Sequence, residues 1–172
     1  SIFSEYSDDI EPLSLDEAFI DVSQSPKFNG SATLIAKEIR EKVFKRVGIT
    51  VSAGVAANKF LAKIASDWNK PDGLFVVPPN QAEAFVATLP VEKIHGVGKA
   101  TAARLHQRGL YQCRDIQNQG MKTMLDQFGQ FGRHLYQLSQ GIDDRPVRIS
   151  RQRKSISVER TFSEDIETLT GC

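Results

Sequence analysis

Cysteine is scarce in this sequence, and long apolar runs are absent from it. The sequence therefore lacks the usual features of disulfide-rich and of membrane-spanning proteins. The two cysteines, Cys113 and Cys172, are far apart, which argues against a disulfide framework or a zinc pattern and favours a reducing compartment such as the cytoplasm. The three histidines show no metal-ligand spacing. No apolar run approaches the roughly 20 residues of a membrane span, so no membrane partner is expected. The net charge is only +1, so any basic surface must be local.

What is present is enough apolar sequence for a core, arranged in two different patterns. Hydrophobic residues make up 40% of the chain and charged residues 25%. Strand and helix patterns alternate up to about residue 78, with Ser31 and Asn58 placed to cap the two helices. The pattern predicts strands over 10–22, 49–56 and 74–77 and helices over 31–47 and 58–69.

Only helical patterns follow this α/β unit. Residues 80–141 predict several short helices, the first opened by a capping box of Asn80 and Glu83. Gly141 is expected to end the last of them, with Pro146 preventing continuation. Near the end, the alternation in "SISVE" predicts one more strand. The fold class is therefore α+β, with an all-α unit between two parts that contain strands.

The stretch "PLSLDEAFIDV", residues 12–22, places three carboxylates among apolar residues. Burial of an ionised carboxylate without a partner is very costly. Neighbouring residues on a strand point to opposite faces, so Asp16 and Glu17 could share an ion only where the strand turns. Oxygen ligands of this kind suit magnesium, and a pair of magnesium ions suits phosphoryl or nucleotidyl transfer. On spacing alone, a surface hairpin with acids facing water explains the pattern as well.

Four motifs in order resemble those of the Y-family translesion DNA polymerases, most closely the bacterial DNA polymerase IV type. "PLSLDEAFIDV" and "SAGVAANKFLAKIASDWNKPDG" resemble the two palm signatures, and "KIHGVGKATAARL" resembles the thumb hairpin. "RKSISVERTF" resembles the entry to the little-finger domain. The resemblance implies a partial palm with a mixed sheet and helices over residues 1–78 and a small all-α thumb over 79–147. A basic linker with the first little-finger strand would follow over 148–172.

The resemblance also implies the chemistry: addition of deoxynucleotides to a primer on a DNA template at low fidelity. Asp16 and Glu17 would help to hold two Mg²⁺ ions, and Lys70 would contact the triphosphate of the incoming nucleotide. Asp21 is expected either to be structural or to support the metal-binding residues from behind. Lys59 and Lys63 have solubility as the default role and a phosphate role as the alternative.

"IHGVGKATAARLHQRGL" has the features of a helix-hairpin-helix, which grips the nucleic-acid backbone without base contacts. Gly96 and Gly98 flank Val97, where glycine would permit backbone angles that other residues avoid. A helix starting at once, near Lys99, would offer its free N–H groups and positive dipole end to phosphate. A plain helix–helix turn is the alternative. His95 stands where relatives usually carry proline, and "FGQFGRHL" is expected to serve packing first and DNA second.

A basic cluster in the connector, made of Arg148, Arg151, Arg153 and Lys154, is expected either to be solvated or to contact the DNA backbone. Both chain ends look cut, and the resemblance implies that a further metal-binding aspartate, the fingers and a sliding-clamp peptide lie outside this chain. The expected partners are primer–template DNA, deoxynucleoside triphosphates and, through that outside region, a sliding clamp. The chain is expected to be monomeric and inactive alone. Two rival hypotheses are a non-enzymatic helix-hairpin-helix DNA-binding module and a nucleotide cyclase.

Overall fold

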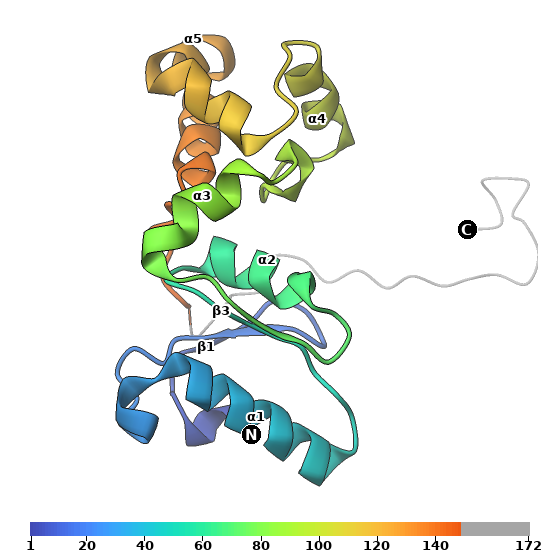
Figure 1. The fold of residues 1–172 in the computed structure, drawn as a ribbon, viewed down its shortest axis with the longest axis vertical. Coiled ribbons are helices and arrows are strands. Elements are labelled where there is room, and N and C mark those ends of the chain that lie inside the picture. The colour runs from blue at the N-terminus through green and yellow to red at the C-terminus, as the bar shows by residue number, and fades with distance from the viewer. Residues whose placement is uncertain (149–172) are drawn as a thin grey trace, which may run out of the picture.

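The computed structural model describes residues 1–148, and the elements stack along one long axis (Figure 1). α1 lies at one end, α4 and α5 lie at the other, and the strands and α2 lie between them. In chain order the strands and α-helices are β1 Ile10–Pro12, β2 Ala18–Ile20, α1 Ala32–Val47, β3 Ala53–Val55, α2 Lys59–Trp68, β4 Leu74–Val76, α3 Ala82–Ala87, α4 Lys99–His106 and α5 Cys113–Ser139. Short 3₁₀ turns cover Phe3–Glu5, Lys27–Gly30, Pro79–Gln81 and Val91–Lys93.

The first predicted strand is a hairpin rather than one continuous strand. β1 and β2 pair antiparallel, with Ile10 opposite Ile20. The chain reverses between them because the backbone N–H groups of Leu13 and Ser14 both donate to the carbonyl of Glu17, at 2.8 and 3.2 Å. The turn therefore lies where the sequence predicted the middle of a strand. This correction places the acidic pair at a hairpin tip.

The predicted mixed sheet is present as two separate two-stranded ladders within the described residues. β3 and β4 pair parallel, with Gly54 opposite Phe75, while β1 pairs only with β2. Both kinds of pairing are thus found, but in different ladders. α1 and α2 lie on opposite sides of this layer of strands (Figure 1).

Both helices of this half begin at the predicted caps. The Ser31 side chain accepts from the N–H of Leu34, and the Asn58 side chain accepts from the N–H of Leu61. These side chains satisfy donors that the first turn of a helix would otherwise leave unpaired. The sequence therefore predicts the starts of α1 and α2 correctly.

Gly54 allows α2 to pack directly on β3. A Cβ built on Gly54 would lie 2.1 Å from the carbonyl oxygen of Ala62 and 2.3 Å from the nitrogen of Ser66. Both neighbours are backbone atoms of the helix, so no side-chain rotation could relieve the overlap. Glycine at position 54 is the residue that permits this close approach of helix and strand.

The hydrophobic core has two parts that lie on the two sides of the strand layer. The smaller part contains Tyr6, Ile35, Ile39 and Val43 and lies between α1 and the strands. The larger begins at Phe60 on α2 and continues without interruption to Leu138 on α5. The α/β half and the helical half therefore share apolar packing, and α2 contributes to both halves.

The helical half differs from its prediction at two places. The capping box of Asn80 and Glu83 is not formed: α3 begins after a 3₁₀ turn, and no side chain caps it. α5 spans Cys113–Ser139, with non-helical backbone angles at Gly120 and Gly129 that divide it into shorter helical pieces. Gly141 ends α5 as predicted, with φ +76° and its N–H donating to the carbonyl of Leu138.

Residues 141–148, the return segment, run from the end of α5 back to the start of α2. The Asn58 amide donates to the Gly141 carbonyl at 2.8 Å, and the N–H of Phe60 donates to Asp143 at 3.1 Å. Arg145 forms two hydrogen bonds to the same Asp143 carboxylate, at 2.7 and 2.8 Å. These bonds hold the exit of α5 against the N-terminus of α2. Within residues 1–148, no helix is long and apolar enough to cross a membrane.

Candidate active site and nucleic-acid interface

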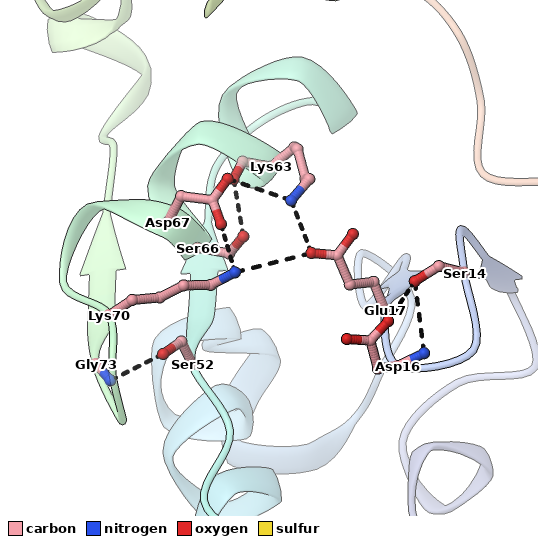
Figure 2. Close-up of polar contacts among 9 residues, drawn as sticks. All are labelled: Ser14, Asp16, Glu17, Ser52, Lys63, Ser66, Asp67, Lys70 and Gly73. Carbon is pink, nitrogen blue, oxygen red and sulfur yellow. Dashed lines mark hydrogen bonds and ion pairs between the residues drawn. The ribbon is translucent and has the colours of Figure 1, made fainter.

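The β1–β2 turn carries Asp16 and Glu17. The Glu17 side chain points toward Lys63 on α2 (Figure 2). Because both residues lie in a turn, the strand alternation that would send them to opposite faces does not apply. Asp16 is exposed and Glu17 is partly buried. The Asp16 carboxylate accepts from the Ser14 hydroxyl at 2.6 Å, and this hydrogen bond is the main reason that its pKa lies below the ordinary value. The nearby charges of Lys70 and Lys63 act in the same direction.

Two lysines from α2 and the following turn reach the Glu17 carboxylate. The Nζ of Lys63 lies 2.7 Å from Glu17 Oε1, and the Nζ of Lys70 lies 3.8 Å from the same oxygen. A second carboxylate, Asp67, contacts both ammonium groups from the other side, 2.6 Å from Lys70 and 3.2 Å from Lys63. Figure 2 shows the four side chains as a closed ring of alternating charge. We call this set, Glu17, Lys63, Asp67 and Lys70, the charge ring.

The residues present fit a hard divalent cation as part of its ligand set. Asp16 and Glu17 supply carboxylate oxygens from adjacent positions at an accessible hairpin tip, and oxygen is the ligand such cations prefer. In residues 1–148, however, no group of three acidic, histidine or cysteine side chains gathers in a metal-ligating cluster. Two carboxylates are therefore the contribution of this part of the chain.

Two carboxylates outside this pair have different roles. Asp21 accepts from the N–H and hydroxyl of Ser23 at 2.9 and 2.6 Å and so closes the turn after β2, which agrees with its predicted structural role. The second is Glu11, a buried residue with 3% exposure. Its carboxylate lies 2.6 Å from the Nζ of Lys59 and accepts from the N–H of Arg148 at 2.8 Å. Sequence reasoning missed Glu11 because it precedes the acidic motif.

The segment predicted to be a helix-hairpin-helix forms a short 3₁₀ turn, a hairpin and α4. Gly96 has φ +92°, a region that favours glycine, and Val97 packs into the core at 9% exposure. Gly98 has φ −85°, which any residue can adopt, so the expectation that its backbone requires glycine is wrong. Its Cβ position has no atom within 4 Å and faces open space. A side chain at Gly98 would therefore be tolerated by the fold.

The start of α4 is exposed and has no side-chain cap. Gly98 is the N-cap residue and makes no side-chain hydrogen bond to the helix. Gly98 and Lys99 are both exposed, so the first N–H groups of α4 and the Lys99 ammonium share one accessible surface. N–H groups at a helix start attract phosphate because they lack intrahelical acceptors and carry the positive end of the dipole.

The second glycine-containing segment, residues 128–135, serves packing as predicted. Phe128 and Phe131 lie against the larger core. A Cβ on Gly132 would lie 1.9 Å from the carbonyl oxygen of Met124, so this glycine permits a close backbone contact. The predicted DNA contacts at Arg151, Arg153 and Lys154, and the predicted strand "SISVE", lie outside the described residues.

Comparison with known proteins agrees with both halves of this arrangement. Residues 1–67 match the model of the impB/mucB/samB family, and residues 92–143 match the model described as DNA polymerase-iota, thumb domain. The DNA polymerase IV of Pseudomonas aeruginosa is 56% identical over 172 residues, which is 100% of this chain and 49% of that protein. A solved Y-family DNA polymerase chimera built on Dbh superposes with a TM-score of 0.78 at 33% identity, covering 89% of this chain and 45% of that one.

The chain belongs to the Y-family DNA polymerases. Its resemblance is to the bacterial DNA polymerase IV type, as the motifs suggested. A structure titled as the insertion ternary complex of Dbh DNA polymerase is a further Y-family relative, with a TM-score of 0.75, 33% identity and coverage of 85% of this chain and 43% of that one. This Y-family chain spans about half the length of the curated relatives it matches. The α+β fold class is confirmed, and DNA polymerases of this family use divalent metal ions.

Proposed function

We propose that this chain is the palm and thumb part of an enzyme that adds deoxynucleotides to a primer on a DNA template and can copy past damaged bases. The observation that carries the proposal is the charge ring beside the acidic turn in a Y-family chain. Carboxylates at a hairpin tip and lysines on the facing helix provide the two kinds of charge that nucleotidyl transfer requires. Such catalysis depends on positioning and on electrostatic stabilisation of the reacting phosphate.

Asp16 and Glu17 would hold Mg²⁺ in this enzyme, with two ions as the expected number. The ions would neutralise the charge that develops on the transferred phosphate and lower the pKa of the attacking hydroxyl. The low pKa of Asp16 supports its part, since the carboxylate stays ionised and ready to coordinate. Glu17 is held by Lys63 and Lys70, so a cation that binds Glu17 competes with these two ammonium groups.

Lys70 would then bind the triphosphate of the incoming nucleotide. Its ammonium lies 3.8 Å from Glu17, and its side chain is half exposed, so a charged ligand can reach it. When Glu17 carries metal, Lys70 is available to phosphate oxygens at the same place. A lysine there acts as a point charge against phosphate.

The exposed start of α4 would grip the backbone of primer–template DNA through Gly96, Val97, Gly98 and Lys99. The proposed contacts use backbone N–H groups and one ammonium, so they carry no base information. Arg151, Arg153 and Lys154 would add phosphate contacts in the connector. We further propose palm, thumb and linker boundaries at 1–78, 79–147 and 148–172, a monomeric enzyme, and clamp binding through a region outside this chain.

Primer extension by a complete polymerase that contains this chain tests the proposal. We expect extension that depends on the template base, on a divalent cation and on deoxynucleotides, with loss of activity in Asp16→Asn. The 172-residue chain alone should not extend primers, because its described residues bring only two carboxylates to the turn. A complete protein that binds DNA tightly but never extends a primer would favour the binding-module hypothesis. Formation of a cyclic nucleotide from ATP would favour the cyclase.

A further inference from the structure

Asp67 lies within the second quoted palm motif, but sequence analysis assigned it no role. It lies in the last turn of α2 and uses its two carboxylate oxygens separately. Oδ1 lies 2.6 Å from the Nζ of Lys70, and Oδ2 lies 3.2 Å from the Nζ of Lys63. One carboxylate thus bridges the two lysines that also contact Glu17 (Figure 2).

We propose that Asp67 is a positioning residue for the polymerase reaction, holding Lys63 and Lys70 in place for the triphosphate once Glu17 binds metal. The proposal rests on the proposed function. Its physical basis is an exchange of partners: Glu17 and Asp67 share the two lysines in the structure, and metal binding takes Glu17 out of that ring. Asp67 is then the carboxylate of the ring that still orients both ammonium groups.

Asp67 lies where an acid is unfavourable for the helix itself. The C-terminal end of a helix carries the negative end of the dipole, and aspartate is a poor helix former. A purely structural role in α2 would be better served by a neutral or basic residue. An aspartate at this place in the helix is explained if its carboxylate serves to hold Lys63 and Lys70.

The charge states fit this role. Partial burial alone would raise the pKa of Asp67, but hydrogen bonds from Lys70 and Lys63 outweigh it, so the pKa lies below the ordinary value. Partial burial alone would lower the pKa of Lys63, but its bonds to Glu17 and Asp67 raise it. The lowered pKa of Asp67 agrees with the ion pairs that its carboxylate makes with both lysines.

Asp67→Asn tests the proposal in a complete polymerase that contains this chain, because asparagine keeps the size and loses the charge. We expect kcat/KM for the incoming deoxynucleotide to fall about five- to twentyfold, the size expected for one half-exposed charged hydrogen-bonded contact. The dissociation constant for primer–template should stay unchanged. Asp67→Glu, which keeps the charge, should retain more of the efficiency than Asp67→Asn.

A double-mutant cycle with Lys70→Met separates positioning from general damage. If Asp67 acts through the lysines, Asp67→Asn should cost much less in the Lys70→Met background than alone. Glu41→Gln is the matched control, since Glu41 pairs with Lys45 at i,i+4 on α1 and is not part of the charge ring. It removes an equivalent helix ion pair and should leave the kinetics unchanged.

Three results would overturn the proposal. Asp67→Asn with normal or higher nucleotide efficiency would show that Asp67 does not orient the lysines. Equal losses for Asp67→Asn with and without Lys70→Met, or no advantage of Asp67→Glu, would show damage that does not pass through the lysines. If the unmodified polymerase failed to extend primers at all, the proposed function would fail and the role of Asp67 with it, a result distinct from the other two.

Discussion

Lys59→Met tests the anchor that holds the β1–β2 hairpin to α2 and to the return segment. The side chains of Lys59 and Glu11 are 11% and 4% exposed, and their charged atoms are 2.6 Å apart. Glu11 lies on β1, directly before the turn that carries Asp16 and Glu17. Methionine keeps most of the volume and removes the charge, so the buried Glu11 carboxylate loses the Lys59 ammonium but keeps its hydrogen bond from the N–H of Arg148.

The expected cost is large because the pair is buried. Removal of one partner of a buried ion pair destabilises a protein by about 3–5 kcal/mol. Because Glu11 keeps the Arg148 N–H bond, we expect a cost near the lower end of that range. With a urea m-value of about 2 kcal/mol/M, 3 kcal/mol lowers the unfolding midpoint by about 1.5 M. The matched control is Lys45→Met, since Lys45 and Glu41 are 74% and 66% exposed and 3.7 Å apart. The control should cost at most about 0.5 kcal/mol.

Urea unfolding of the chain, followed by circular dichroism, measures both variants. Adding Glu11→Gln to Lys59→Met should recover part of the lost stability, because the buried charge is then removed as well. If Lys59→Met costs no more than the Lys45→Met control, the buried pair does not stabilise the hairpin. A double variant that is no more stable than Lys59→Met would also refute the reasoning, because the loss of the Lys59 charge beside the Glu11 carboxylate would not be the cause.

Three further predictions concern the nucleotide, the DNA and the packing of α2. Lys70→Ala in a complete polymerase should lower kcat/KM for the deoxynucleotide about ten- to a hundredfold, from about 1.5–3 kcal/mol for one charged contact; an unchanged value would remove Lys70 from the site. Gly98→Asp should fold normally, because its φ is ordinary and its Cβ meets open space, yet weaken DNA binding on every sequence and more strongly at low salt. Undiminished binding at low salt would contradict the phosphate grip. Gly54→Ala should destabilise the chain by at least about 1–3 kcal/mol, because its Cβ would lie 2.1 Å from the Ala62 backbone; a normal melting temperature would contradict this.

Local signals predicted the parts of the fold that depend on neighbouring residues. The helix starts at Ser31 and Asn58 and the helix end at Gly141 follow from capping chemistry within a few positions. The capping box at Asn80 failed because Pro79 begins a 3₁₀ turn there, which shifts the start of α3 to Ala82. The hairpin at 13–17 was missed because its alternating apolar residues resemble a continuous strand.

Contacts between distant residues could not be predicted from the pattern. Glu11 pairs with Lys59, and Asp143 accepts from the N–H of Phe60, across 48 and 83 positions. Asp67 received no role from its sequence position, because only the fold brings Glu17 to the same two lysines. The motifs drew attention to Asp16, Glu17 and Lys70. Only the fold shows that Lys63 pairs with Glu17 and that Asp67 pairs with Lys70.

The central claim is that the acidic turn is half of a metal-dependent nucleotidyl-transfer site. Single-turnover incorporation by a complete polymerase, measured by rapid quench with Asp16→Asn and Glu17→Gln, tests it most directly. We predict that each substitution slows the chemical step by about a thousandfold or more, since the metal-held phosphate charge is no longer stabilised. Primer–template affinity should be retained, because the DNA contacts that we propose lie at the start of α4 and in the connector. Incorporation by both variants at rates near that of the unmodified enzyme would contradict the claim.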